Sequence, residues 1–199
     1  ISALENLGIK PIAYAGTSAG ALISAFAAAG MNSTEMEEHL LQLRRADFWD
    51  PDYLGLLRSL PSGLNSWSGL LKGDLFRDKI TSLLPVDNFE SCPKRCCIVS
   101  INLSKNTPEI FRHGSLIDAV CASCAVPFMF QPFKIDTEYH VDGGIFEKAP
   151  IRSLFDTCPL DAIIVSYIPP KTLVSEMKLR HNIISTKPRQ YSLDLSLIH

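Results

Sequence analysis

Gly16, Ser18 and Gly20 form a G-x-S-x-G pentapeptide, completed by Thr17 and Ala19. This spacing is typical of a nucleophile elbow, a sharp turn between a strand and a helix that exposes the serine Oγ. The backbones on the two sides of such a serine approach closely, so only a minimal side chain fits there. The following helix N-terminus would offer free N–H groups to a developing oxyanion. We therefore interpret Ser18 as a nucleophile, with a merely structural turn as the alternative.

The surrounding sequence supplies the elements that an elbow needs. Residues 12–16 (IAYAG) are short and apolar enough for a buried strand, and residues 18–29 continue as an alanine-rich helix that Gly30 stops. A phosphate-binding P-loop would require a lysine after its glycines. No lysine or arginine occurs between Lys10 and Arg44, which argues against that alternative.

A serine nucleophile needs a base, and Asp142 is the favoured candidate. It ends an alternating, strand-like run and precedes Gly143 and Gly144, which allow the backbone to approach the carboxylate closely. The alternative for this D-G-G sequence is an ordinary type I′ turn. His140 is the second candidate base, because alternation along a strand turns it to the same side as Asp142. The other histidines are His39, His113, His181 and His199.

The composition indicates an ordinary globular protein of one domain. Of 199 residues, 46% are hydrophobic and 20% are charged, with a formal net charge of -2. No basic block is present that could neutralise phosphates, so we expect no nucleic-acid partner. The six cysteines do not form the spacing of a disulfide scaffold, which favours a reducing, cytoplasmic location. A single C-x-x-C at residues 121–124 is weak evidence for a metal or redox site, and we expect neither metal nor cofactor.

Two apolar stretches raise the question of membranes. Residues 11–34 carry no charge, but their proline, glycines and hydroxyl residues predict a strand, a turn and a helix rather than a membrane span. Residues 47–73 combine tryptophans, leucines, prolines and glycines in an irregular pattern. This second stretch is interpreted either as packing against the core or as a lid that faces lipid, and peripheral membrane contact stays open.

The order of the remaining elements predicts an α/β fold. We expect helices at residues 1–7, 33–48, 73–84, 115–125 and 151–158, and strands at 96–103, 109–113 and 161–168, the last buried on both faces. Residues 133–144 alternate as in a hairpin that ends in the double glycine. Asn32 and Glu35 predict a capping box for the second of these helices. Leu75, Ile80, Leu83 and Leu84 are expected to face inward. Strands that alternate with helices favour a three-layer α/β/α sandwich with a largely parallel central sheet.

The motifs together resemble the patatin-like phospholipase family. Besides GTSAG and VDGG, the segments GLLKGDLF, CCIVSINLSKNTPEIFRHG, ASCAVPFMFQPF and YHVDGGIFEKAP follow in the order of that family and extend over nearly the whole chain. The resemblance implies a Ser-Asp dyad of Ser18 and Asp142, with no catalytic histidine and no metal. It also implies hydrolysis of phospholipids, lysophospholipids or simpler lipid esters.

The sequence departs from the family in three places. Family members carry a glycine-rich oxyanion loop on a strand upstream of the elbow, and we expect a single domain over residues 1–199 that lacks this strand and loop. Asn102 stands where the family often has an acidic residue, and FEKAP replaces an asparagine-rich run after the glycines. Two alternatives therefore stay open: a histidine-dependent α/β-hydrolase, and a noncatalytic lipid-binding or interaction module.

Overall fold

A computed structural model describes residues 1–62, 68–145, 150–155, 157–166 and 182–185. Its helices are α1 Ser2–Asn6, α2 Ala19–Ala28, α3 Ser33–Gln42, α4 Tyr53–Ser59, α5 Asp74–Leu83, α6 Leu116–Cys124 and α7 Ile151–Phe155. Its strands are β1 Ala13–Gly16, β2 Gly69–Leu71, β3 Arg95–Asn102, β4 Thr107–Phe111, β5 Phe128–Phe130, β6 Phe133–Ile135, β7 Glu138–Asp142, β8 Ala162–Val165 and β9 Asn182–Ser185. Each helix and strand expected from the sequence lies at or near its predicted position.

The main sheet is organised around β3, which is longer than its neighbours and pairs with three of them. Its first half pairs with β1 in parallel, with Gly16 opposite Ile98. Its second half pairs with β4 and β7, both antiparallel, and β6 extends the sheet beyond β7. The end of β1 and the end of β7 are therefore both aligned on the same strand.

The sheet is mixed, so the prediction of a largely parallel sheet is wrong. In this sheet only the β1–β3 pair is parallel among the described residues. Residues 103–106 join β3 to β4, and residues 136–137 join β6 to β7. Connections this short can join only antiparallel neighbours, because a parallel crossover needs a dozen or more residues. Asn106 and Asp136 take positive φ angles in these turns.

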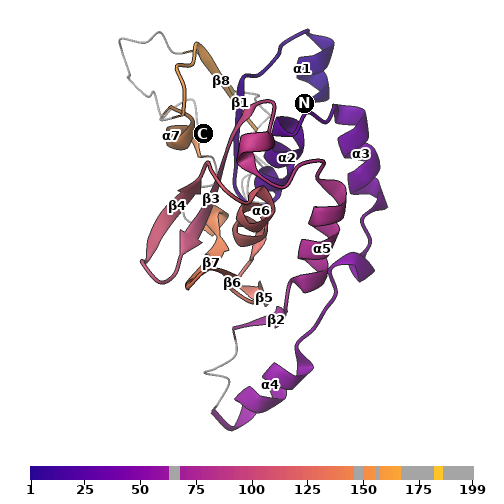
Figure 1. Cartoon of the computed structure of the whole chain (residues 1–199), viewed down its shortest axis with the longest axis vertical. Coiled ribbons are helices and arrows are strands. Elements are labelled where there is room, and N and C mark those ends of the chain that lie inside the picture. Colours follow the sequence, from indigo (N-terminus) through magenta and orange to yellow (C-terminus); the bar gives the residue numbers. More distant parts are fainter. Residues whose placement is uncertain (63–67, 146–149, 156, 167–181, 186–199) are drawn as a thin grey trace, which may run out of the picture.

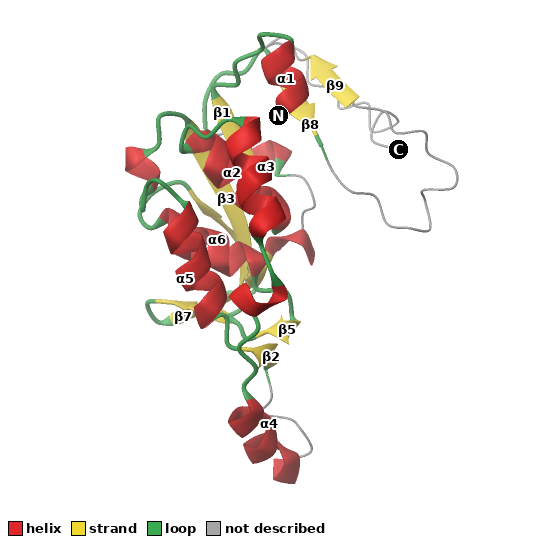
Figure 2. Ribbon diagram, turned by 90° about the vertical axis from the view of Figure 1, so that its right-hand side faces the viewer, coloured by secondary structure: helices red, strands yellow, loops and turns green. Residues whose placement is uncertain are grey.

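Helices lie on the sheet as an α/β fold requires. Helices α2 and α6 pack against β1, β3 and β7, and α5 packs on α6 (Figure 1). The short helix α7 contacts β1 and in Figure 1 lies on the side of β1 away from α2. Figure 2, turned by 90°, shows the helical layer of α2, α3, α5 and α6 beside the long strand β3. The predicted α/β class is confirmed.

Small side chains allow α2 to lie close to the sheet. Ala21, Ala25 and Ala28 are completely buried, as is Phe26 on the same helix. Helix α5 is amphipathic, but one of its predicted inward positions is wrong. Ile80, Leu83 and Leu84 contribute to the core, whereas Leu75 is 40% exposed and Phe76 packs inward in its place. The adjacent positions differ because helical periodicity places neighbouring residues about 100° apart around the axis.

Helix α3 begins as predicted but ends earlier. Asn32 Oδ1 accepts the N–H of Glu35, and the Glu35 carboxylate accepts the N–H of Asn32, which is the expected capping box. The helix ends at Gln42 instead of continuing to residue 48, and a 3₁₀ turn follows at Arg45–Asp47. None of the helices in the described ranges has the length and apolar character needed to cross a bilayer.

The apolar segment 47–73 divides between the two interpretations made from its sequence. Phe48, Trp49 and Leu71 pack with Phe130 in a second, smaller core cluster. Helix α4, in contrast, leaves four large apolar side chains more than half exposed: Tyr53, Leu54, Leu57 and Leu60. Both views show α4 at one end of the molecule, beyond β2 and β5 (Figures 1 and 2). Residues 63–67 of this segment lie outside the described residues.

The strand predicted to be buried on both faces is buried on one. In β8, Ile163 is buried while Ala162 and Ile164 are exposed, and β8 pairs with β9 in antiparallel fashion. A strand paired in a separate two-stranded sheet lacks the second covering layer that a central parallel strand has.

The turn between β1 and α2 has no room for a side chain at Gly16, whereas a side chain would fit at Gly20. A Cβ built on Gly16 would lie 2.1 Å from the backbone oxygen of Gly20. A Cβ built on Gly20 would meet no atom within 4 Å. The prediction that only a minimal side chain fits is confirmed at Gly16 and wrong at Gly20. At Gly20 the backbone atoms make the close approach to Gly16, so a Cβ on Gly20 would not clash.

We predict that Gly16→Ala and Gly20→Ala differ sharply in stability. The first should lower the free energy of unfolding by about 3 kcal/mol or more, because rigid backbone atoms cannot move away from the new methyl group. The second should leave it unchanged or raise it by up to about 1 kcal/mol, since alanine is the better helix former. Urea unfolding of the two variants measures this difference, and equal losses of stability would contradict the assignment.

Candidate active site

Ser18 lies between the end of β1 and the beginning of α2, in a backbone conformation that serine rarely adopts. Its φ and ψ angles are 54° and -130°. Residues held in such sparsely populated regions cost about 1–3 kcal/mol and persist only where the surroundings enforce them. The strand, the sharp turn and the ten-residue helix α2 follow in the order expected of a nucleophile elbow. Ser18 itself is partly exposed, whereas Thr17 before it is buried.

The N-terminus of α2 offers a backbone donor next to Ser18. The Gly20 N–H donates to Thr17 O, and the Ser18 N–H donates to a side chain of α6. The Ala19 N–H has no acceptor among the described residues. It therefore meets the requirement for an oxyanion donor directly after the nucleophile, in the positive field of the helix end.

Asp142 is the last residue of β7 and is almost completely buried, at 5% exposure. Its N–H donates to Ala125 O at 2.9 Å, and its Oδ1 accepts the N–H of Gly144 at 2.7 Å. Gly143–Ile145 form a 3₁₀ turn. Neither Gly143 nor Gly144 has a positive φ, so the alternative of a type I′ turn, which requires two positive φ angles, is excluded.

Gly143 is required by close packing at this turn. A Cβ built on it would lie 2.3 Å from Val99 O and 3.2 Å from Thr17 Cγ2. The turn after β7 therefore presses directly on β3 and on the residue that precedes the nucleophile. The prediction that a glycine here permits tight backbone approach agrees with this geometry.

Ser18 and Asp142 both lie close to Gly144. A Cβ built on Gly144 would be 3.0 Å from Asp142 Oδ1 and 4.0 Å from Ser18 Cβ. The fold thus brings together two residues that are distant in the sequence. Within the described contacts Ser18 Oγ makes no hydrogen bond, so the pair is adjacent but not hydrogen-bonded. Catalytic hydrogen bonds are often long in the free enzyme and shorten when substrate binds.

The histidines take other roles where the structure describes them. His140 is buried, its Nδ1 lies 3.0 Å from Ser100 Oγ, and its ring packs on Phe111. His39 packs near Phe26, and His113 forms an exposed ion pair with Glu90. None of these three contacts Ser18. His181 and His199 lie outside the described residues.

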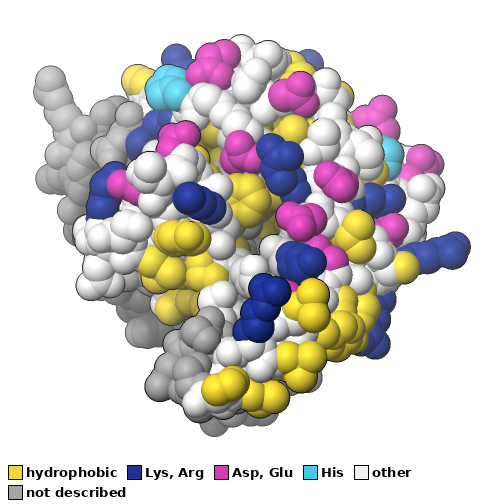
Figure 3. All heavy atoms as spheres, turned by 60° about the horizontal axis from the view of Figure 1, so that its bottom comes forward, with side chains coloured by type: hydrophobic (Ala, Val, Ile, Leu, Met, Phe, Trp, Pro, Cys, Tyr) yellow, Lys and Arg dark blue, Asp and Glu magenta, His cyan; other side chains and the backbone are white. Residues whose placement is uncertain are grey.

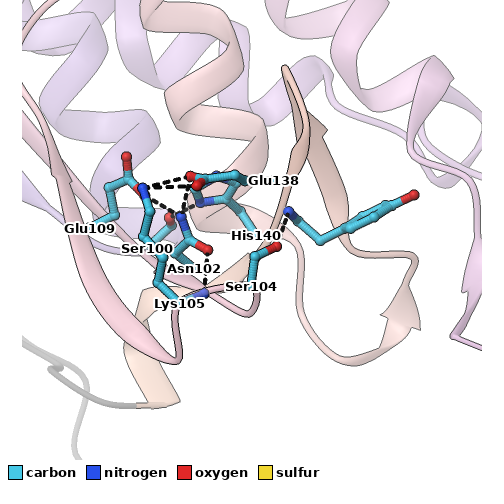
Figure 4. A network of polar contacts seen from close by, with 8 residues as sticks. Ser100, Asn102, Ser104, Lys105, Glu109, Glu138 and His140 are labelled. Atoms are coloured by element: carbon cyan, nitrogen blue, oxygen red, sulfur yellow. Dashed lines mark hydrogen bonds and ion pairs between the residues drawn. The ribbon is translucent and has the colours of Figure 1, made fainter.

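A polar network closes the end of the sheet beyond Asp142 (Figure 4). Asn102 is completely buried, and its Nδ2 donates to one carboxylate oxygen each of Glu109 and Glu138, both at 2.6 Å. Lys105 Nζ adds an ion pair with Glu138 at 2.9 Å. The asparagine, which departs from the family pattern, is thus the neutral donor that holds two carboxylates together.

Glu109, Glu138 and His140 each offer a ligand atom within 4.8 Å of the others. Both carboxylates nevertheless accept hydrogen bonds from Asn102, and Lys105 supplies a cation to Glu138. The Lys105 ammonium and then the Asn102 amide hold the pKa of Glu138 below its ordinary value. The Asn102 amide therefore donates to both carboxylates, and the Lys105 ammonium pairs with Glu138.

The C-x-x-C cysteines lie on α6, where Cys121 is buried and Cys124 is partly buried. Burial raises the pKa of Cys121 to about 12 and that of Cys124 still further. Such thiols stay protonated near neutral pH and are poor nucleophiles and metal ligands. All six cysteines are free in the structure.

One contact of the elbow was missed from the sequence. Ser123, completely buried on α6, accepts the N–H of Ser18. The motif ASCAVPFMFQPF contains this serine, yet nothing in its pattern indicates that its hydroxyl turns toward the elbow. The contact exists only because α6 packs against α2 and β3.

We predict that His140 makes stability depend on pH. Burial lowers its pKa, with Glu109 and Glu138 acting in the opposite direction. The unfolded chain therefore binds a proton at a higher pH, near 6.5, than the folded chain does. Stability should be full above about pH 7 and should fall as the pH drops below 6.5 toward the folded pKa.

Urea unfolding at pH 7.5, 6.5 and 5.5 tests this prediction. His140→Gln should flatten the fall in stability over this range. His113→Gln, the same change at an exposed position, should leave it close to that of the wild type. An equal slope for the wild type and His140→Gln would show that other groups cause the dependence.

The chain is similar in sequence to known proteins. The Patatin-like phospholipase family model matches residues 1–155. YqhO of Bacillus subtilis (strain 168) is 31% identical over 169 residues, 74% of this chain and 58% of that protein. The NTE family protein Rv1063c of Mycobacterium tuberculosis (strain H37Rv) is 26% identical over 154 residues, 77% of this chain and 40% of that protein.

Among solved structures, VipD from Legionella pneumophila aligns with a TM-score of 0.43 and 18% identity, over 73% of this chain and 43% of that one. The chain thus spans about half the length of the curated relatives it matches. The family model extends from α1 through the elbow and the Asp142 turn to α7. The chain therefore belongs to the patatin-like phospholipase family.

Proposed function

We propose that the protein is a lipid acyl hydrolase that acts through a dyad of Ser18 and Asp142. The observation that carries this proposal is the position of the two residues, since Ser18 Cβ and Asp142 Oδ1 both lie within 4.0 Å of one point above Gly144. Family membership supports the same reaction class. The substrates are phospholipids, lysophospholipids or simpler lipid esters.

In the proposed reaction Asp142 accepts the hydroxyl proton of Ser18 while Oγ attacks the ester carbonyl carbon. The carbonyl oxygen takes the negative charge and the Ala19 N–H stabilises it. The carbon–oxygen bond to the alcohol or lysolipid then breaks, and that leaving group takes the proton from Asp142. Water, deprotonated by the same carboxylate, attacks the acyl-serine, and the proton returns to Ser18 Oγ as the fatty acid leaves.

The surroundings of Asp142 suit a carboxylate that must act as a base. A free aspartate has a pKa near 4 and is a weak base, so orientation has to compensate. The Gly144 N–H holds Oδ1, and the Asp142 N–H donates to Ala125 O at the end of α6. Asp142 Oδ2 has no donor among the described residues. This oxygen is therefore available to take the serine proton.

We predict that Ser18→Ala and Asp142→Asn each lower kcat of the full-length protein on a short-chain nitrophenyl ester by about 10³-fold or more, because each removes one half of the dyad. Ser82→Ala and Asp136→Asn, the same changes at exposed positions, should stay within about twofold of wild type. Thermal unfolding checks that all four variants are folded.

A fluorophosphonate probe separates the alternatives. Covalent labelling of wild type and its loss in Ser18→Ala are the expected results. An unlabelled, inactive wild type would overturn the proposal in favour of a noncatalytic lipid-binding module. Full activity of Asp142→Asn would remove the dyad and favour a histidine base, to be located by replacing His140, His181 and His199.

We further propose that the molecule touches membranes at the end formed by α4 and β5. The exposed side chains of α4 are accompanied by Phe128 and Met129 of β5, which are 77% and 43% exposed. In Figure 3, which turns this end of the molecule toward the viewer, hydrophobic side chains lie together with lysines and arginines. Arg58 and Lys72 are exposed at the same end. Apolar residues flanked by cations suit an anionic lipid surface. Free cysteines throughout fit a cytoplasmic location.

We predict that Leu54→Ser combined with Leu57→Ser weakens binding to vesicles of phosphatidylcholine and phosphatidylglycerol by at least about tenfold, because two apolar side chains no longer enter the lipid. Leu41→Ser, a change at an exposed leucine of α3, is the matched control and should bind as wild type does. Flotation assays measure the bound fraction. Equal binding by the double variant would show that α4 is not the contact.

A further inference from the structure

The last turn of α6 reaches the elbow through the hydroxyl of Ser123. Ser123 Oγ accepts the N–H of Ser18 at 2.9 Å and donates its own hydrogen to Val99 O at 2.7 Å. A hydroxyl has a single hydrogen to donate, so its bond to β3 fixes the direction in which the lone pairs point. One of these lone pairs accepts the backbone N–H of the nucleophile, Ser18.

The two residues that follow Ser123 continue this attachment. Cys124 Sγ lies 3.2 Å from Ser18 O as a donor, so both backbone polar groups of Ser18 are held by α6. Ala125 O accepts the N–H of Asp142 at 2.9 Å. Three consecutive residues of one helix end therefore hold the backbones of both dyad residues.

This attachment has a consequence for the oxyanion. Because the Ser18 N–H is used by Ser123, it is not free to stabilise charge on a substrate. The Ala19 N–H, in contrast, has no acceptor among the described residues. The two adjacent N–H groups therefore have different roles in the proposed reaction. The Ser18 N–H is structural, whereas the Ala19 N–H is the oxyanion donor.

From these contacts we infer that Ser123 is a positioning residue for the reaction, and this inference rests on the proposed function. Its hydroxyl holds Ser18 in the strained conformation with φ of 54°, in which Ser18 Cβ lies near the Asp142 carboxylate. Without the hydroxyl, both the Ser18 N–H and the Val99 carbonyl lose a buried partner. The turn can then relax and move Oγ away from the carboxylate, and a displacement of about 1 Å can cost a hundredfold in rate.

Ser153 provides a matched control for the loss of a buried hydroxyl. It is 1% exposed, compared with 0% for Ser123, and also lies on a helix. Its Oγ has no hydrogen-bond partner in the described part of the chain. Ser153→Ala therefore removes a hydroxyl of equal burial that holds no part of the elbow.

The test is the steady-state kinetics of Ser123→Ala in the full-length protein, with a nitrophenyl ester as substrate. We expect kcat to fall about 10- to 100-fold with KM within about twofold, because the interaction acts on the transition state and not on substrate binding. The rate of labelling of Ser18 by a fluorophosphonate should fall in parallel. Ser153→Ala should keep both rates within about twofold of wild type.

A second variant covers the case in which Ser123→Ala does not fold. Ser123→Cys keeps a weaker donor and acceptor at the same position. We expect it to unfold at nearly the wild-type temperature with a kcat between those of wild type and Ser123→Ala. Wild-type kcat in either folded variant would overturn the positioning role. An inactive, unlabelled wild type would instead overturn the dyad itself, so the two failures are distinguishable.

Discussion

The register of β3 with β1 and β7 is the constraint on which the candidate site depends. Gly16 at the end of β1 pairs with Ile98, and Asp142 at the end of β7 pairs with Ser100, two residues further along the same strand. Two residues of strand span about 7 Å, which sets the separation of the elbow and the carboxylate. A slip of one residue in the β3–β7 register would turn Asp142 to the other face of the sheet. No local feature of either loop could compensate for that change.

Close backbone contacts hold the elbow and the turn after β7 together at the candidate site. The turn after β7 presses on Val99 and Thr17, and the elbow folds back on its own helix, so Gly143 and Gly16 have no space for a side chain. The end of α6 also forms hydrogen bonds with the backbones of Ser18 and Asp142. Ser18 can therefore hold a conformation that its own preferences oppose, since the surrounding contacts together outweigh the local cost.

Two surfaces of the molecule differ in polarity. Beyond Asp142 the sheet ends in a network in which the Asn102 amide holds two carboxylates and Lys105 pairs with one of them. At the end of α4 and β5, large apolar side chains meet solvent with cations nearby. A carboxylate near a saturated polar network keeps its orientation, whereas an apolar, basic surface suits contact with lipid. The proposed contact with lipid rests on this difference.

The sequence alone determined the local elements. The elbow motif, the Asn32 capping box and the β6–β7 hairpin all follow from neighbouring residues, and the resemblance to the patatin-like phospholipases supplied Asp142 as the partner of Ser18. Periodicity did not determine sheet direction, since β3 pairs with β4 and β7 in antiparallel fashion where a largely parallel sheet was expected. It also could not reveal Ser123, the exposed face of α4 or the open position of Gly20. These features depend on which surfaces meet after folding, and local sequence encodes a segment's preferences but not its distant neighbours.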